Sequence, residues 1–490
     1  MGNNGHKLKK RGVKLSIYFL SLLIVAIAAI GGTYAWIGRS VTLPSTVEII
    51  QGTNSSTLDI AASERIGAVY QTLLNNYVEG VDKEALIEGA LSGMVEAVGD
   101  PYSQYLNTEE SENLDETISA SFEGIGAEIM SLNQQIVIVS PIKGSPAEKA
   151  GLLPNDIILS ADGESLQGLT ASEAVALIRG EKGSEVVLEI VRGDQTFKVN
   201  ITRDTIPIET VTFELDEEYP EIGIVHVSSF STPTYDDIVS AVTDLRTQGA
   251  TSFVFDFRQN PGGLLDQALK ISNMFLDDGD VIMQTQEKDA EPNKIVASES
   301  EFGDFKITEP SVLLVDEGSA SASEIVAGAL QESSEIPLVG TTTFGKGTVQ
   351  TVYPLTESSE LKLTVAKWLT PNGNWIHQKG IAVDYEVALP EYATLTIIDS
   401  TATYEEGTVS EEVKNVEAML NAIGYAVEAD GYYDEATVEQ VASFQAANEL
   451  DATGIVTGDT ALAIVEKLRE VLTENDTQYD KAVEILMGNE

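Results

Sequence analysis

The first strong feature of the chain is an apolar run of 23 residues, 15–37, which directly follows a short basic segment. As a helix, this run would span roughly 35 Å, enough to cross the hydrocarbon core of a membrane. Residues 1–14 carry five basic side chains and no acidic one, so we expect this flank to stay cytoplasmic and the rest to lie outside. A cleaved signal peptide is the alternative, but residues 33–36 are a poor cleavage site. The pattern therefore predicts a single-pass anchor.

Changes of pattern after the anchor predict the domain boundaries. Residues 38–56 are rich in serine and threonine and are typical of a stalk. Apolar residues then recur at helical spacing in a region from 57 to 117. Short strands and turns fill 118–205, and strands alternate with helices from 206 to 395. The alternation predicts an α/β layer with parallel strands.

The C-terminal part is predicted to be helical. A linker at 396–410 leads to a unit at 411–472 with three helical apolar patterns, and an acidic tail at 473–490 is expected to be loose. The fold class is thus multidomain α/β: a transmembrane helix, a helical N-terminal region, two further domains and a small three-helix module. In the α/β domain the expected strands lie near 222–228, 252–257, 312–315 and 338–340, and the expected helices near 234–248, 264–276 and 321–331.

Composition excludes several classes of function. The 490 residues include 78 acidic and 29 basic side chains, for a net charge of −49, and such a surface repels nucleic-acid phosphates. The absence of cysteine excludes disulfides, thiol catalysis and zinc sites of the cysteine type. Only three histidines are present, His6, His226 and His377, and His6 lies in the predicted cytoplasmic segment. Neither a metal nor a cofactor is implied by any motif.

A serine at a predicted strand-to-helix turn is the leading candidate for a nucleophile. The buried-strand pattern 311–315 is followed by a small-residue turn with Ser321, and then by an apolar helix. A serine at this place sits beside free backbone N–H groups and the positive end of the helix dipole, which can stabilise an oxyanion. The spacing of Ser321 and Glu324 is also that of a capping box, so a purely structural role is the alternative.

A nucleophilic serine needs a base, and Lys346 is the candidate. It lies between two glycines in an apolar neighbourhood, where burial would lower the pKa of its amine. If the segment is extended, Lys346, Thr348 and Gln350 share one face, and Gln350 can orient the lysine or a nearby hydroxyl by hydrogen bonding. An ordinary solvated lysine is the alternative. His226 lies within an apolar strand and is expected to be structural, whereas His377 stays a rival base.

Four segments together resemble the carboxyl-terminal processing (tail-specific) proteases. The resemblance covers roughly residues 60–390, and the segments occur in the family's order. They are 93–102 (Gly-Met-Val-Glu-Ala-Val-Gly-Asp-Pro-Tyr), 256–263 (Asp-Phe-Arg-Gln-Asn-Pro-Gly-Gly), 319–325 (Ser-Ala-Ser-Ala-Ser-Glu-Ile) and 344–350 (Phe-Gly-Lys-Gly-Thr-Val-Gln).

The resemblance implies a Ser–Lys dyad in a serine protease core at 206–395. Ser321 would be the nucleophile, Lys346 the general base and Gln350 the assisting glutamine. The oxyanion donors would be the backbone N–H groups of Ala322 and of Gly263. The family often pairs through its N-terminal helices, so the resemblance also implies a homodimer. At the position of Glu332 some family members have an important aspartate, but we assign Glu332 no catalytic role.

Residues 118–205 resemble a PDZ domain. The loop Gly124, Ile125, Gly126 and Ala127 would present N–H groups to the terminal carboxylate of a peptide, and the strand after it would pair with that peptide. Protein substrates with free, apolar C-termini are therefore the expected partners. Arg179, at the end of the expected PDZ helix, is either an interdomain contact or an exposed helix-terminal arginine. A PDZ domain that never presents a substrate is the alternative.

Residues 411–472 resemble a small three-helix peptidoglycan-binding module. The chain departs from that family's pattern at Tyr433 and Asp434, where a second glycine is usual. Peptidoglycan is the implied partner, in a Gram-positive-like envelope, and a structural or dimerising helical cap is the alternative.

Together these features predict a membrane-anchored extracytoplasmic serine endopeptidase that captures protein C-termini. A non-catalytic adaptor between PDZ ligands and peptidoglycan is the alternative.

Overall fold

The computed structural model describes residues 60–132, 134–356 and 358–488. The predicted anchor 15–37, its basic flank and the stalk lie outside these residues. Within the described ranges, no helix is both long enough and apolar enough to cross a membrane. The described residues form two compact units: 60–108 together with 352–356 and 358–362, and 109–132 together with 134–351 and 363–488.

The first unit is built around two helices, α2 (Ile60–Asn76) and α3 (Lys83–Glu96). The Asp82 side chain caps α3 by accepting the Ala85 N–H at 3.0 Å, which satisfies one of the free donors at the helix start. Strand β1 (Gln104–Leu106) pairs antiparallel with residues 360–362. Several large apolar side chains of α2 and α3 stay exposed, namely Ile66, Val69, Leu73, Ile87 and Met94.

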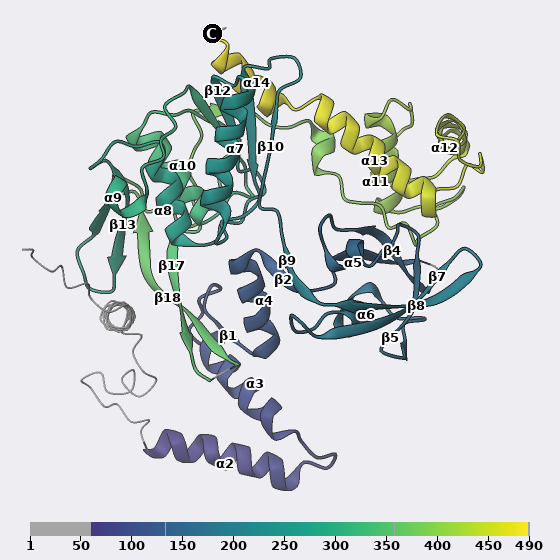
Figure 1. Ribbon diagram of the computed structural model, residues 1–490, viewed down its shortest axis with the longest axis horizontal. Coiled ribbons are helices and arrows are strands. Elements are labelled where there is room, and N and C mark those ends of the chain that lie inside the picture. Colours follow the sequence, from purple (N-terminus) through teal and green to yellow (C-terminus); the bar gives the residue numbers. More distant parts are fainter. Residues whose placement is uncertain (1–59, 133, 357, 489–490) are drawn as a thin grey trace, which may run out of the picture. The chain divides into compact units, whose positions relative to one another are not determined.

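In the second unit, the PDZ region is a sheet in the order β3-β4-β5-β7-β8, with β6 paired to β5 (Figure 1). Alternate residues of its strands point into the core, as Ile136 and Ile138 do. Helix α6 (Ala171–Ile178) begins at a capping box between Thr170 and Glu173. The strands are β3 (Ala127–Leu132), β4 (Gln135–Pro141), β5 (Ile157–Ala161), β6 (Glu164–Ser165), β7 (Glu185–Arg192) and β8 (Gln195–Thr202).

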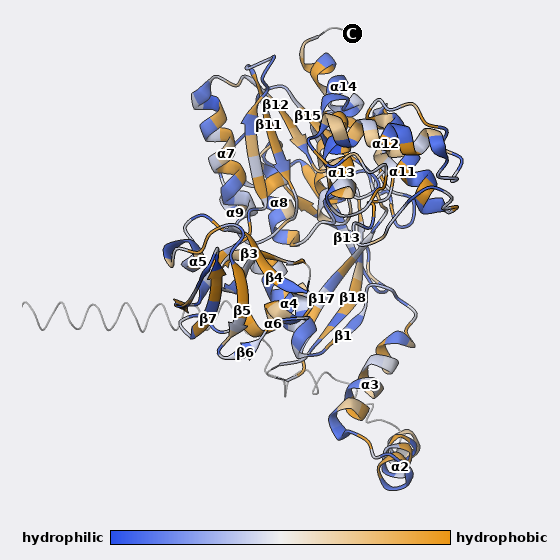
Figure 2. Ribbon diagram, turned by 90° about the vertical axis from the view of Figure 1, so that its right-hand side faces the viewer, coloured by the Kyte–Doolittle hydropathy of each residue, from blue (hydrophilic) through white to orange (hydrophobic). Residues whose placement is uncertain are grey.

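The α/β domain contains the parallel sheet that the alternating pattern predicts. Its order is β10-β11-β12-β15-β16-β19, and only β10 is antiparallel to its neighbour. Figure 2 shows its strands as largely hydrophobic, as expected for a sheet covered on both faces. The strands are β10 (Val211–Leu215), β11 (Ile222–Val227), β12 (Ser252–Asp256), β15 (Ser311–Val315), β16 (Leu338–Gly340) and β19 (Tyr385–Glu386), and the main helices are α7 (Thr234–Gln248), α8 (Leu265–Asn273) and α10 (Ala322–Ser333).

The two faces of this sheet are covered by different parts of the chain. Phe253, Phe255 and Leu313 pack with α7, α8 and α10, whereas Val254 and Leu314 face the opposite side. That opposite side is covered by α14 (Thr477–Leu486), so the prediction of a loose tail after 473 is wrong. The apolar residues of the tail recur at helical spacing, and burying them outweighs the acidity that favoured a loose tail.

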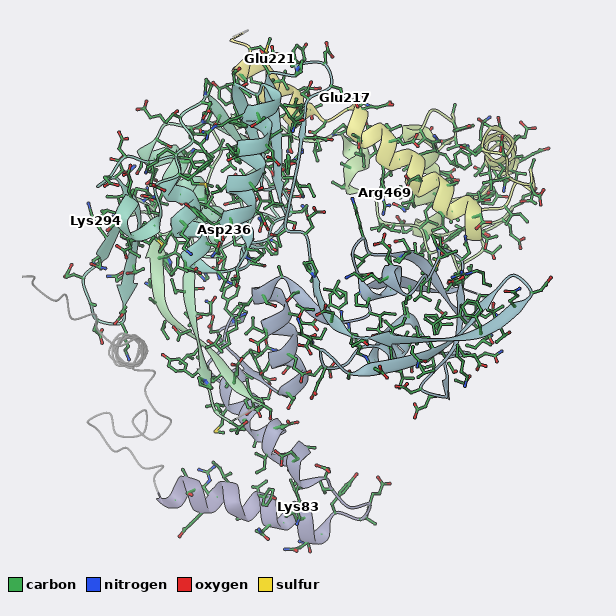
Figure 3. The ribbon with its side chains drawn as sticks, viewed as in Figure 1. Lys83, Glu217, Glu221, Asp236, Lys294 and Arg469 are labelled. Atoms are coloured by element: carbon green, nitrogen blue, oxygen red, sulfur yellow. The ribbon has the colours of Figure 1, made fainter. Side chains whose placement is uncertain are left out.

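The helical unit that precedes α14 matches the predicted three-helix pattern. It consists of α11 (Glu411–Ala422), α12 (Glu435–Ala447) and α13 (Gly458–Glu474). Most of their predicted apolar residues are buried in one cluster, among them Val413, Val416, Leu420, Val441, Phe444 and Leu468, whereas Leu462 is exposed. Many acidic side chains of the α/β domain face solvent: Figure 3 labels Glu217, Glu221 and Asp236 on its surface, and all three are exposed.

Candidate active site

Ser321 lies where sequence reasoning placed it, at the start of α10 after the turn that leaves β15. Its backbone has φ 55° and ψ −110°, a conformation that a residue with a side chain rarely adopts and that the surrounding contacts must hold. The N–H of Ser321 donates to the Glu324 carboxylate at 2.8 Å, within the predicted capping box. Capping and a catalytic role are therefore compatible at this serine.

Glu324 does far more than cap a helix. It is completely buried, and besides the Ser321 N–H it accepts the Thr343 hydroxyl at 2.7 Å, the Gly345 N–H at 2.7 Å and the Lys346 N–H at 2.8 Å. One carboxylate thus joins the turn of the candidate nucleophile to the loop of the candidate base. Sequence reasoning missed this role, although an acidic residue inside an apolar helix pattern was a signal for it.

The loop that carries Lys346 is held against the Ser321 turn by further contacts. The Phe344 N–H donates to the Ser319 carbonyl at 3.0 Å, and the Lys346 carbonyl accepts the indole N–H of Trp368 at 2.7 Å. A Cβ on Gly345 would lie 2.9 Å from the Lys379 backbone nitrogen, so the loop packs too tightly for any other residue there. Lys346 itself is half-buried.

Gln350 lies on β17 (Thr348–Pro354), close to the lysine. Its amide donates to the hydroxyls of Thr348 at 2.9 Å and of Thr364, on β18 (Glu360–Leu369), at 3.0 Å. Thr348 and Gln350 therefore share a face, as the extended-segment prediction requires. These two hydrogen bonds fix the orientation of the Gln350 side-chain amide.

The Asn-Pro-Gly-Gly turn contacts the Ser321 turn directly. The carbonyl of Asn260, a fully buried residue, accepts the Ala320 N–H at 3.0 Å and the Ser323 hydroxyl at 2.9 Å. A Cβ on Gly262 would lie 2.8 Å from the Ala322 nitrogen, so only glycine allows this approach. Sequence reasoning did not single out Asn260.

The two predicted oxyanion donors lie on these adjoining turns. The Gly262 N–H is occupied by the Asn260 side-chain oxygen at 2.9 Å, whereas neither the Gly263 N–H nor the Ala322 N–H donates to another described residue. Gly263 has φ 150° and pairs with Phe230. Two unsatisfied donors beside one serine are the arrangement that an oxyanion requires.

The remaining histidines are placed differently. His226 lies half-exposed on β11 with its Nδ1 3.7 Å from the Asp256 carboxylate, and this hydrogen-bonding partner raises the pKa of His226. The His377 ring stacks on Trp375 with a centroid separation of 5.2 Å, next to the lysine loop, where the Gln378 N–H donates to Gly345. His226 thus has the structural environment that was expected.

The loop expected to bind a terminal carboxylate runs between β2 (Ser121–Gly124) and β3. Ile125 is buried, and its carbonyl accepts the Ala147 N–H, while the Gly126 carbonyl accepts the Ile142 N–H. Within the described residues, the N–H groups of Ile125 and Gly126 find no acceptor. Gly126 has φ 72° and a Cβ there would lie 2.5 Å from Ser145, so glycine is required. Ala127 starts β3, an edge strand of its sheet.

Arg179 connects the PDZ helix to the element before it. Its guanidinium donates to both Glu116 oxygens at 2.9 Å and lies 4.5 Å from the ring centre of Phe122. Glu116 belongs to α4 (Thr108–Ser119). Arg179 thus binds α4 and the start of the PDZ region with a side chain that is 40% exposed, and its predicted contact with the protease core stays a prediction. Glu332, in contrast, binds Thr370, Asn372 and Asn374 at the far end of α10, a structural arrangement.

In the C-terminal unit, Tyr433 takes the place of a glycine with a specific contact. Its ring is fully buried and its hydroxyl donates to the Gly454 carbonyl at 2.9 Å. Asp434 caps α12 by accepting the Thr437 N–H at 2.8 Å. The departure from the family pattern thus falls on residues that stabilise the fold of the unit.

Four family models match the chain. "Peptidase family S41" matches residues 221–387, "Activating protease CtpB N-terminal domain" residues 25–110, "PDZ domain" residues 137–192 and "Putative peptidoglycan binding domain" residues 409–464.

Relatives of known name match along nearly the whole chain. "Carboxy-terminal processing protease CtpA" of Bacillus subtilis is 43% identical over 97% of this chain and 99% of its own length. A "Probable CtpA-like serine protease" of Staphylococcus aureus is 36% identical over 97% of this chain and 93% of its own length. Among solved structures, a photosystem II D1 C-terminal processing protease is 28% identical, covers 67% of this chain and 88% of its own, and has a TM-score of 0.39. The chain therefore belongs to the carboxy-terminal processing proteases of peptidase family S41, and it is a serine-type protease with a PDZ domain and a peptidoglycan-binding domain.

Proposed function

We propose that the protein is a membrane-anchored, extracytoplasmic endopeptidase that captures protein C-termini with its PDZ domain and cleaves them with a Ser321–Lys346 dyad. The observation that carries the chemistry is the Glu324 carboxylate, which accepts N–H groups of both residues at 2.8 Å. Two loops held by one buried acceptor keep the nucleophile and the base in a fixed relation.

In this mechanism the unprotonated amine of Lys346 takes the hydroxyl proton of Ser321, and the serine oxygen attacks the scissile carbonyl. The N–H groups of Ala322 and Gly263 stabilise the oxyanion of the tetrahedral intermediate. The proton then passes to the leaving amine, and water hydrolyses the acyl-enzyme by the same route. Gln350 orients the Thr348 hydroxyl, two residues after the lysine, by donating a hydrogen bond to it.

The decisive test compares Ser321→Ala and Lys346→Ala in the ectodomain without residues 1–38. Both variants are expected to lose at least about 10³-fold in peptide turnover while they still bind the peptide. A Ser321→Ala variant that retains full function in cells would instead support the non-catalytic PDZ–peptidoglycan adaptor. A Lys346→Ala variant that stays active, with an inactive His377→Ala variant, would assign the base to His377.

Capture of C-termini is supported by the loop 124–127 and by the edge strand that follows it. The N–H groups of Ile125 and Gly126 can donate hydrogen bonds to a terminal carboxylate, and β3 can pair with the peptide behind it. Two apolar peptides that differ only in a free or an amidated C-terminus test this step. The free peptide should have the higher kcat/KM by about ten-fold or more; equal cleavage of both would remove carboxylate capture from the mechanism.

The proposal also includes two attachments. The predicted anchor 15–37 would hold the enzyme at the membrane, and the helical unit at 411–472 would bind the adjacent peptidoglycan. This helical unit has a groove of about 320 Å³ with aromatic and polar lining side chains, among them Tyr425, Phe444, Asn448 and Lys467. Fractionation of cells with and without residues 1–38, and pull-down of the ectodomain on purified cell walls, test the two separately.

A homodimer through α2 and α3 completes the proposal. These helices line an apolar groove of about 840 Å³, and Val69 is 62% exposed although it lies in a helical apolar stripe. Exposure of a large apolar surface to water is unfavourable. A second copy of the chain, with the same apolar stripe, can cover this surface in a symmetric dimer.

A further inference from the structure

The helix that ends the described chain, α14, is part of the catalytic domain although the peptidoglycan-binding domain lies before it in sequence. Ala482 is fully buried in one cluster with Val254, Leu314 and Val339 of the central sheet. The Thr477 hydroxyl donates to the Ala388 carbonyl at 2.8 Å, next to the last strand of that sheet. The peptidoglycan-binding domain is therefore an insertion whose two ends leave the catalytic domain side by side.

The start of α14 makes an ion pair with the turn that reaches the nucleophile. The Asp476 carboxylate lies 2.8 Å from the guanidinium of Arg258, and the Gln478 side-chain oxygen accepts from the same nitrogen at 3.1 Å. The other side of this guanidinium donates to both oxygens of Asp256, at 2.9 and 2.7 Å. Arg258 is only 16% exposed, and Asp476 only 21%. Charged hydrogen bonds with this little solvent are stronger than surface pairs.

Arg258 lies two residues before Asn260. The two residues that follow Arg258 bind the turn 316–320, which leads to Ser321. Gln259 donates from its N–H and from its amide to the two Asp316 oxygens, at 2.8 Å each. The Asn260 carbonyl accepts the Ala320 N–H, one residue before Ser321. Asp476 is therefore connected through Arg258 and the backbone of residues 258–260 to the turn that carries the Gly263 N–H.

We infer that Asp476 is a positioning residue for proteolysis: through Arg258 it sets the turn 258–263, and α14 is needed for turnover even though it lies beyond the peptidoglycan-binding domain. This inference rests on the proposed Ser–Lys mechanism, because the turn matters through the oxyanion that it would bind. Without the Asp476 charge, Arg258 keeps Asp256 and the neutral Gln478 oxygen but loses the charged partner on its far side. The turn then gains freedom, and the oxyanion donor loses its preorganisation.

The test is Asp476→Asn in the ectodomain, with Asp480→Asn as the control. Asparagine still caps α14, because its oxygen can accept the Tyr479 N–H that Asp476 accepts at 3.0 Å. The substitution therefore removes the negative charge that faces Arg258 and keeps the helix start. Asp480 is exposed on the same helix. We expect kcat to fall by about ten-fold or more in Asp476→Asn with KM within two-fold, and the control to match the unmodified protein.

Two deletions separate the helix from the inserted domain. Replacing residues 392–474 by a short Gly/Ser linker keeps α14 and should keep peptide turnover. A chain that stops after Glu474 lacks α14 and should lose turnover, and adding a synthetic peptide of residues 475–490 should restore part of it. Because the truncated chain can fail to fold, the point variant decides the matter.

A kcat of Asp476→Asn equal to that of Asp480→Asn would overturn the inference, as would a folded and fully active chain without α14. The Ser321→Ala variant keeps this outcome distinct from failure of the proposed function. If Ser321→Ala is inactive while Asp476→Asn has normal kcat, only the positioning role fails; if Ser321→Ala is active, the proposed chemistry fails.

Discussion

The Glu324 carboxylate accepts the backbone N–H of Lys346 at 2.8 Å, 22 positions along the chain, and so fixes the segment of the proposed base to the helix that begins at the proposed nucleophile, Ser321. Glu324→Gln should therefore reduce kcat by at least about 10²-fold and destabilise the fold by roughly 2–4 kcal/mol. The physical reason is that an amide presents an NH₂ group to two of the four donors that the carboxylate accepts. Steady-state kinetics and urea unfolding measure the two effects.

Glu317→Gln is the matched control for this prediction. Glu317 lies exposed on the same turn and accepts a single hydrogen bond, from the Thr341 hydroxyl at 2.9 Å. Its substitution should leave both kcat and the urea midpoint nearly unchanged. Equal effects of the two substitutions would mean that the four-donor site at Glu324 has no special role.

Gly262 is predicted to be required for two reasons: its backbone has a positive φ, and no room is left for a side chain beside the Ser321 turn. With φ at +95°, a Cβ at this position would lie 2.5 Å from the Ala320 carbonyl oxygen and 2.9 Å from the Ser321 Cβ. Gly262→Ala should therefore displace the nucleophile turn and lower kcat/KM by at least about 10²-fold.

Gly279→Ala is the control that separates strain from contact. Gly279 has nearly the same φ, +98°, but nothing lies within 4 Å of an added Cβ. It should lose stability by about 1 kcal/mol and keep its kcat/KM. If both alanine variants lose activity alike, or neither does, the close approach of Gly262 to Ser321 is not what matters.

The contact between His226 and Asp256 predicts a pH-dependent contribution to stability. Burial alone would raise the pKa of Asp256, but hydrogen bonds from His226 and Arg258 lower it to about 2, so this carboxylate stays charged throughout the range in which His226 titrates. The hydrogen bond to Asp256 raises the pKa of His226 above its ordinary 6.5. The contribution is thus fully present below pH 6.5 and is lost as the pH rises through the raised pKa.

Urea unfolding of the unmodified ectodomain and of His226→Gln at pH 5.5 and 8.5 measures this contribution. The free energy of unfolding should differ between the two proteins more at pH 5.5, by up to about 1 kcal/mol, because the histidine side chain is 46% exposed and its charge is partly screened. A difference that is the same at both pH values would show that the contact does not titrate.

The exposed stripe on α2 predicts how the proposed dimer can be broken. Val69→Asp places a charge in the apolar groove and should raise the dimer dissociation constant by at least about ten-fold. Gln71→Asp adds the same charge on the same helix, at an exposed position that does not line the groove, and should leave the dimer intact. Light scattering over a range of concentrations reports the mass; a monomer in both the unmodified protein and the control would refute the dimer.

The outcome for individual segments shows which signals in the chain were reliable. The alternation of apolar runs and helical patterns correctly predicted β11, β12, β15 and β16, because each strand is buried on both faces and has a local signature. The tail was mispredicted for a related reason. Considered locally, its many charges favour a loose tail. The apolar side of α14 is buried only because it packs against a sheet face formed by residues more than 130 positions earlier in the chain.

The order of the domains, the strand-to-helix turn at Ser321 and the glycine-flanked Lys346 were all legible in the amino-acid order, because each depends on residues near one another in the chain. The hydrogen-bonding partners of buried polar groups could not be predicted from the sequence. Glu324 meets four donors from two segments, the Ser321 turn and the loop 343–346, and Asp476 meets Arg258 across 218 positions. No periodicity encodes such pairs: they exist because folding brings distant groups into a space without water, where each must find a partner or destabilise the fold.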